Sequence, residues 1–395
     1  MEPAPLNNAG KPSLTLFAAQ TLVERLAALR KHVEPGRASH NAQAVHQLRV
    51  ASRRLRAALG AFDDVLPAKS ARRWRQDTKR LTKALGEVRD LDVQIEWLDG
   101  VLEATPSTKL RTGLRRLRLR LLQQRQTHQP RVVKELDRLE NAPVLAQMPD
   151  ELHGLTVKAR MNGGRPDDPA LQDFARPRIE RALEEMLAYD SVAGQPHLTE
   201  QLHQLRIAAK RLRYTMELFK PLYADALEKP IKHARKLQAA LGNVHDMDVW
   251  IDWLPTFLEA ERHRTRVFQG HLRGFKRIAT GIEHLREHCI GQRERAYEQF
   301  IAQWRRRAEK GTWDKLRRTL ADPPQPNAPQ EPGAPDDAPI AEPEPNAEVE
   351  IEVQPHRPLP GSHRFDPAHR ETDPQPASTP HQDANRPRDR EITDN

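Results

Sequence analysis

The 395 residues carry a formal net charge of +9 at pH 7, but residues 321–395 sum to −10, whereas residues 1–320 hold 58 basic against 39 acidic side chains and sum to +19. A region this basic attracts polyanions, so the candidate partners are nucleic acid, an anionic membrane surface and polyphosphate. The single cysteine, Cys289, excludes an intrachain disulfide. The chain also lacks a signal-peptide pattern and any apolar run near the roughly 18–20 residues that cross a bilayer, which indicates a soluble, cytoplasmic protein without a membrane partner.

Apolar residues recur at three- and four-residue spacing, and no alternating β-branched run interrupts them, so the sequence predicts an all-α fold. Short connections between helices predict antiparallel neighbours, arranged as a pair of bundles of about four long helices each. The first twelve residues and the Pro-rich acidic tail (319–395) are expected to be disordered. The expected helices lie near 13–33, 43–66, 69–86, 91–104 and 107–140, and then near 170–189, 199–220, 226–242, 247–260 and 263–310.

Two motifs occur twice in the same order. The segment Val45–Arg56 recurs as Leu202–Arg213, 157 residues later, and Leu85–Val93 recurs as Leu241–Val249, 156 residues later. Matching blocks at a nearly constant offset indicate a tandem duplication. We therefore divide the helical domain, 13–318, into repeat one (13–140), a connector (141–169) and repeat two (170–318).

The first repeated motif predicts a helix with one basic side. At about 100° per residue, the basic residues of each copy fall on one side of the helix and the leucines on the other. No acidic residue interrupts either set, whereas a solvated helix face usually mixes both signs. This favours an anion site over a solvated surface. The first stripe is His46, Arg49, Arg53 and Arg56, and the second stripe is His203, Arg206, Lys210, Arg213 and Tyr214.

The residue types of the two stripes suit phosphate. Guanidinium groups donate two hydrogen bonds to one phosphate, lysine adds a point charge, and histidine near a helix start adds a donor. The helix that follows each stripe carries more cations, which are either anion contacts or solvated side chains. These are Lys79 and Lys83 in repeat one and Arg235 and Lys236 in repeat two.

The aspartate pairs Asp90–Asp92 and Asp246–Asp248 belong to the second repeated motif. They could bind a metal or act in acid–base catalysis. Each pair, however, follows a glycine and precedes an apolar run, where a helix N-cap belongs. We therefore interpret them as caps, with pairing to Arg89, and predict no metal, no cofactor and no catalytic residue.

Taken together, His-x-x-Arg-[Val/Ile]-x-x-[Arg/Lys]-Arg-Leu-Arg followed by Leu-Gly-x-Val-x-Asp-x-Asp-Val, both present twice, resembles the CHAD family (conserved histidine α-helical domain). The resemblance covers roughly residues 13–310. It implies two bundles related by pseudo-twofold symmetry around a basic groove or pore, binding of inorganic polyphosphate, and association with polyphosphate granules. The two stripes carry over as ligand contacts. One departure is His245, which stands where repeat one has Arg89 and should weaken local ion pairing.

Two other functions remain as alternatives. Domains of this kind are often fused to a triphosphate-tunnel hydrolase, which begins with Glu-x-Glu-x-Lys, but only about 40 residues precede the first repeated motif, and Glu348–Glu352 lacks the lysine. Weak nonspecific nucleic-acid binding would need only charge, although aromatic platforms for single strands are scarce at 5% of the chain. Finally, the acidic tail should compete with a polyanion for the basic region.

Overall fold

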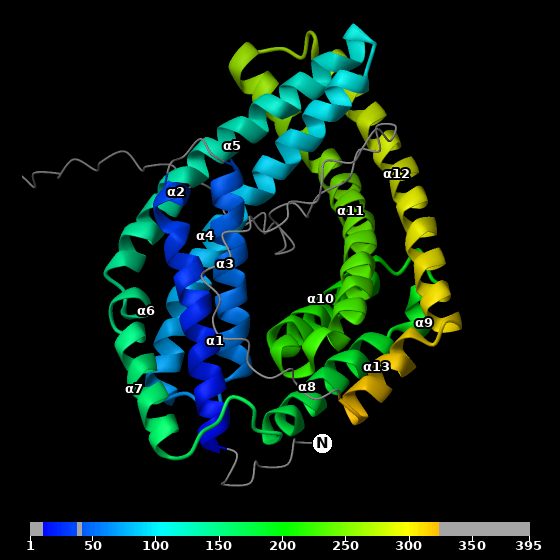
Figure 1. Ribbon diagram of the computed structural model, residues 1–395. Coiled ribbons are helices and arrows are strands. Elements are labelled where there is room, and N and C mark those ends of the chain that lie inside the picture. The colour runs from blue at the N-terminus through cyan, green and yellow to red at the C-terminus, as the bar shows by residue number, and fades with distance from the viewer. Residues whose placement is uncertain (1–10, 38–41, 324–395) are drawn as a thin grey trace, which may run out of the picture. The chain divides into compact units, whose positions relative to one another are not determined.

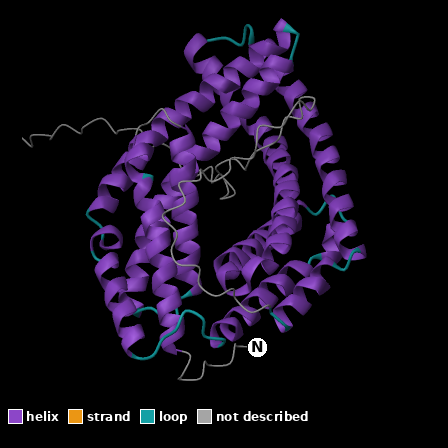
Figure 2. Cartoon of the chain, viewed as in Figure 1, coloured by secondary structure: helices purple, strands orange, loops and turns teal. Residues whose placement is uncertain are grey.

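The computed structural model describes residues 11–37 and 42–323, which belong to one compact unit of the chain. Within these residues the regular structure is helical and contains no strand (Figure 2). The all-α prediction is confirmed. The predicted disordered tail lies outside the described residues from 324 onward, as do the first ten residues.

The long helices occur in the same order in the two repeats (Figure 1). Repeat one comprises α1 (Lys11–Lys31), α2 (Val33–Arg37), α3 (Ala42–Ala61), α4 (Ala68–Ala104) and α5 (Thr108–Glu140). Repeat two comprises α8 (Ala170–Leu187), α9 (Asp190–Ala193), α10 (Thr199–Phe219), the 3₁₀ helix η1 (Lys220–Leu227), α11 (Glu228–Gln269), α12 (Phe275–Glu309) and α13 (Thr312–Ala321). Each repeat therefore has four long helices, in the order α1, α3, α4, α5 and α8, α10, α11, α12.

The connector also contains helices, α6 (Pro143–Ala146) and α7 (Met148–Met161). Helix α7 packs along α1 and buries Met148 and Leu152 completely. At the other end of the described chain, α13 buries Leu316 and Leu320. Because α13 continues to Ala321, the folded chain extends beyond residue 318.

The aspartate pairs do not cap helices, and this prediction was wrong. Helices α4 and α11 each run without interruption through the second motif, so Asp90 and Asp246 lie inside long helices. A glycine inside a helix costs only about 1 kcal/mol relative to alanine. The burial of Leu85, Val88 and their neighbours on the same helix outweighs that cost. The chain leaves α11 only at Gly270, whose φ of 70° is left-handed.

The two repeats meet at two junctions. At one, Phe17 of α1 and Phe62 just after α3 lie 6.3 and 6.2 Å, centroid to centroid, from Phe219 of α10. At the other, the C-terminal parts of α4 and α11 and the N-terminal halves of α5 and α12 share an apolar core. In this core the ring centroids of Trp97 and Trp250 are 5.0 Å apart. Two separate apolar contacts hold the repeats in a defined relation.

The second junction also contains a backbone contact between α5 and α12. A Cβ atom at Gly281 would lie 2.4 Å from the carbonyl oxygen of Leu110 and 2.9 Å from the Cα atom of Gly113. A Cβ at Gly113 would in turn lie 2.4 Å from the carbonyl oxygen of Ile278. Only glycine allows these two helices to approach so closely at this crossing.

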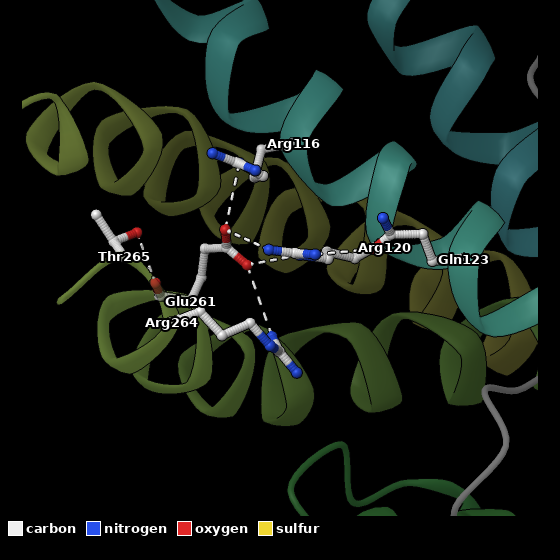
Figure 3. A network of polar contacts seen from close by, with 6 residues as sticks. All are labelled: Arg116, Arg120, Gln123, Glu261, Arg264 and Thr265. Carbon is white, nitrogen blue, oxygen red and sulfur yellow. Dashed lines mark hydrogen bonds and ion pairs between the residues drawn. The ribbon is translucent and has the colours of Figure 1, made fainter. Parts of the chain in front are cut away.

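A buried carboxylate completes this junction (Figure 3). Glu261 of α11 is 1% exposed, and its oxygens lie 2.9 Å from Nε of Arg120 and 3.2 Å from Nε of Arg116, both on α5. Arg264, one turn further along α11, approaches to 3.6 Å. The charge-assisted bonds from α5 join repeat one to repeat two and satisfy a carboxylate that burial would otherwise penalise.

Candidate anion-binding site

Helices α3 and α10 each bury one side and leave the basic stripe outside the apolar core. Leu48, Leu55 and Leu59 are fully buried on α3, and Leu205 and Leu212 are fully buried on α10. The stripe residues lie on the opposite side of each helix, as the helical spacing predicts. Their side chains are half-buried or exposed, apart from Arg206, which is 7% exposed.

Tyr214 brings the two stripes together. The Cζ atom of Arg53, from the first stripe, lies 5.4 Å from the centroid of the Tyr214 ring, and that of Arg213, from the second, lies 4.5 Å away. Both distances fall within the range of cation–π attraction. Helical spacing predicted Tyr214 as a member of the second stripe. In the structure, its ring holds guanidinium groups from both repeats near each other.

The charges of the two stripes also act on one another. Burial lowers the pKa of Lys210 to about 7, and the positive charges of Arg53, Arg206, Arg56 and Arg49 add to the effect. Three of these four arginines belong to the other repeat. Burial likewise lowers the pKa of Arg53 to about 10, with Arg49, Arg213 and Arg56 contributing. The two repeats thus concentrate positive charge in one shared region.

Some of this charge is compensated, contrary to the sequence interpretation. Nη2 of Arg49 lies 3.3 Å from Oδ1 of Asp90 on α4, and Nε of Arg213 lies 3.6 Å from Oε1 of Glu217. Asp90 thus pairs with Arg49 rather than with Arg89. Four other arginine and lysine side chains of the stripes form no ion pair with any residue in the described ranges. The cations without an ion pair are Arg53, Arg56, Arg206 and Lys210.

The corresponding aspartate of repeat two behaves differently. Asp246 is 2% exposed, and neither carboxylate oxygen has a hydrogen-bond partner among the described residues. Burial raises its pKa well above the ordinary value, and the neighbouring charge of Asp90 raises it further, although Arg206 opposes both. Burial thus favours the neutral form of the Asp246 carboxyl group, and a neutral carboxyl group compensates the charge of Arg206 less than a carboxylate would.

His245, the residue that replaces Arg89 in repeat two, contacts the histidine of the second stripe. The Nδ1 atoms of His203 and His245 are 3.1 Å apart, and their ring centroids are 4.0 Å apart. Burial lowers the pKa of His245 to about 3, assisted by Arg206, His203 and Lys210. His245 is thus neutral at physiological pH and serves as a hydrogen-bonding partner of His203.

The second aspartate of each pair pairs with the neighbouring long helix. Asp92 accepts from Nε of Arg125 on α5 at 2.7 Å, and Asp248 pairs with Arg293 on α12. Each aspartate pair thus turns one carboxyl group toward a basic stripe and the other toward the following helix. Across residues 11–37 and 42–323, no group of three or more metal-ligating side chains could hold a metal ion.

The additional cations predicted from the sequence, Lys79, Lys83, Arg235 and Lys236, are all exposed. Arg235 pairs with Glu217 at 3.4 Å and lines a cavity of about 670 Å³. We call this cavity the Tyr214 pocket, because Tyr214 lines it too.

Sequence reasoning missed the other basic residues of the Tyr214 pocket. They come from four different elements, so helical spacing within any one element could not bring them together. Two weak signals were present: Arg54 follows Arg53 directly, and two lysines stand near the start of α11. The missed residues are Arg25, Arg54, Lys220, Lys229 and Lys232.

Comparisons with known proteins agree with the duplicated motifs. The family model described as the CHAD domain matches residues 20–255. Two uncharacterized proteins of Mycobacterium tuberculosis, MT2285 and Rv2226, are each 28% identical over 205 residues, which is 51% of this chain and 38% of theirs. The chain therefore matches well under half the length of these relatives. The crystal structure of the CHAD domain from the plant Ricinus communis superposes with a TM-score of 0.51 at 22% identity, covering 74% of this chain and 91% of that one. That likeness concerns the fold alone.

No described helix combines the length and apolar character that a membrane span requires.

Proposed function

The chain belongs to the CHAD family, and we propose that it binds inorganic polyphosphate, without catalysis, between the basic stripes of α3 and α10. In this proposal the two repeats form pseudo-symmetric walls of one basic groove or pore. The protein acts in the cytoplasm at polyphosphate granules. The family resemblance supplies the ligand class, and the residues of the two stripes supply the contacts.

The observation that carries the proposal is the convergence of cations from both repeats at Tyr214, where Arg53 lies 5.4 Å and Arg213 4.5 Å from the ring centroid. Burial, and then the charges of arginines from both repeats, lowers the pKa of Lys210 to about 7. Such repulsion is unfavourable in the free protein, and an anion placed among these side chains would relieve it. A chain of phosphates supplies a negative charge at every unit, so it could neutralise cations of both stripes at once.

Polyphosphate suits this site better than nucleic acid. The aromatic side chains of the described core, such as Trp97 and Phe219, are buried and cannot stack on bases. Tyr214, the tyrosine of the second stripe, already faces two guanidinium groups. The stripes therefore offer cations that can contact phosphate but no free aromatic side chain that can contact a base. This favours a ligand made only of phosphate.

The test uses two of the unpaired cations. Arg53→Gln with Lys210→Gln removes one charge from each stripe and leaves the Arg49–Asp90 pair intact. We expect weaker polyphosphate binding, with a log–log salt slope lower by roughly 0.7–0.9 for each lost contact. The matched control is Lys134→Gln with Lys276→Gln, two exposed lysines outside the stripes and the Tyr214 pocket.

Polyphosphate binding is measured in competition with duplex DNA for the wild-type chain and both variants, with circular dichroism to verify helicity. Equal losses in the two variants would show that only total charge matters. Equal wild-type affinity for DNA would favour the nucleic-acid alternative. Phosphate release from ATP or triphosphate that follows the purified protein would contradict the non-catalytic part of the proposal.

A further inference from the structure

The Tyr214 pocket is strongly basic, although Tyr214 is the one stripe residue among those that line it. Its lining comes from α1, α3, α10, η1 and α11. Two acidic side chains, Glu217 and Glu228, face a larger set of cations. These cations are Arg25, Arg54, Lys220, Lys229, Lys232 and Arg235.

Both acidic residues of the pocket already have partners. Glu217 pairs with Arg235 at 3.4 Å and with Arg213 at 3.6 Å. Glu228 pairs with Lys220 at 2.7 Å, and this hydrogen bond lowers the pKa of Glu228. The other four cations of the pocket form no ion pair with any residue of 11–37 and 42–323. They are Arg25, Arg54, Lys229 and Lys232.

The positions of these four cations are unfavourable in the absence of an anion. Lys229 and Lys232 lie in the first turns of α11, next to the positive end of a 42-residue helix, where a cation is disfavoured. Burial lowers the pKa of Arg25, and the neighbouring charge of Arg54 lowers it further, although Glu24 and Glu217 oppose this. The helix dipole and the four cations without an ion pair thus favour negative charge in the cavity.

The pocket adjoins the stripes through two consecutive arginines and one tyrosine. Arg53 faces the Tyr214 ring at 5.4 Å, whereas Arg54, the next residue of α3, lines the pocket together with the same tyrosine. We infer that the Tyr214 pocket is a second phosphate-binding compartment, which holds the continuation of a polyphosphate chain whose neighbouring units occupy the stripes. The inference rests on the proposed function.

Two adjoining compartments make affinity depend on chain length. A short anion such as tripolyphosphate occupies one compartment, whereas a long chain occupies both, and its second contact forms at the high local concentration set by the first. Glu217 lines the pocket and pairs both with Arg213 of the second stripe and with Arg235 of the pocket. A polyphosphate chain passing Tyr214 would compete with Glu217 for these two guanidinium groups.

The test is a comparison of chain lengths. Lys229→Gln with Lys232→Gln removes the two exposed lysines of the pocket and leaves every stripe residue unchanged. We expect long-chain polyphosphate to bind about tenfold more weakly, because a contact made at high local concentration is lost. The affinity for tripolyphosphate should change less than twofold. The control Lys134→Gln with Lys276→Gln, which removes the same charge elsewhere, should keep the wild-type ratio of the two affinities.

Each outcome decides between clear alternatives. A ratio of long-chain to tripolyphosphate affinity that falls only in the pocket variant supports the second compartment. An unchanged ratio, or a parallel loss for both ligands, overturns the second compartment while the proposed function stands. Wild-type protein that binds neither ligand overturns the proposed function and this inference with it.

Discussion

Arg49 of α3 packs against Gly86 of α4, so that a Cβ atom at Gly86 would lie only 3.2 Å from Nη1 of the guanidinium. The glycine of the second repeated motif therefore makes room for the arginine of the first. In repeat two the corresponding Gly242 has nothing within 4 Å of its Cβ position. The two copies of the second motif thus differ in whether their glycine contacts an arginine of the basic stripe, and alanine substitutions at Gly86 and Gly242 can test this difference.

We expect Gly86→Ala to displace the Arg49 guanidinium by a few tenths of an ångström, lengthen its ion pair with Asp90 and weaken polyphosphate binding. Gly242→Ala is the matched control. It should raise the free energy of unfolding by about 0.5–1 kcal/mol through helix propensity alone and leave binding unchanged. Denaturant unfolding and a binding isotherm measure both quantities. Identical behaviour of the two variants would show that Gly86 has no particular role.

Lys210→Met should stabilise the free protein while weakening binding. The folded-state pKa of about 7 lies below the ordinary value of 10.5, so between these values the unfolded chain binds more protons. The free energy of unfolding therefore rises with pH across this interval, and the cost of charging Lys210 is complete below about pH 7. We expect a gain of roughly 1–3 kcal/mol at pH 6 that disappears above about pH 10.5.

The same residue should couple binding to protons. A bound anion stabilises the charged amine, so affinity for long polyphosphate should fall as pH rises through about 7, with proton uptake visible by calorimetry in buffers of different ionisation enthalpy. Lys69→Met, at an exposed position on α4, is the control. Proton uptake that persists in Lys210→Met would assign the effect to another group.

Glu261→Gln should weaken the junction between the repeats. The buried carboxylate receives Arg116, Arg120 and Arg264, and its neutralisation leaves three guanidinium groups without their counter-charge. Removing one partner of a buried ion pair costs about 3–5 kcal/mol. Because these arginines are partly exposed, we expect Glu261→Gln to lower the free energy of unfolding by about 2–4 kcal/mol. Glu103→Gln, an exposed residue of α4, should change it by less than about 0.5 kcal/mol. Similar values for both variants would contradict a bridging role of Glu261.

Removal of residues 324–395 should tighten polyphosphate binding at low salt. This segment contains 15 acidic and six basic residues, so it places net negative charge on the same chain as the basic helices. Truncation after Pro323 leaves α13 and the buried Leu320 in place. Because charges are screened beyond about 8 Å at physiological salt, the affinities of the full-length and truncated chains should converge as salt increases. Unchanged affinity at low salt would mean that the tail does not compete.

The elements that depend on local pattern could be predicted from the amino-acid sequence. The three- to four-residue spacing of leucines identified the helices, and the repeated motifs identified the duplication and the family. The side of α3 and α10 that carries the cations followed from helical periodicity, because residues three or four apart share a face regardless of the rest of the fold. These features require only neighbours along the chain.

The continuation of α4 and α11 through the second motif, and the pairing of charges between helices, depend instead on tertiary packing. A glycine followed by aspartates indicates a helix end when local preferences decide, but burial of Leu85 and Leu241 makes the continuous helix more favourable. Likewise, no sequence spacing places Asp90 on Arg49, Glu261 on Arg120, or Lys229 beside Arg25 and Tyr214. Those contacts join segments far apart in the chain, and their pairing follows from the way two repeats pack at two junctions.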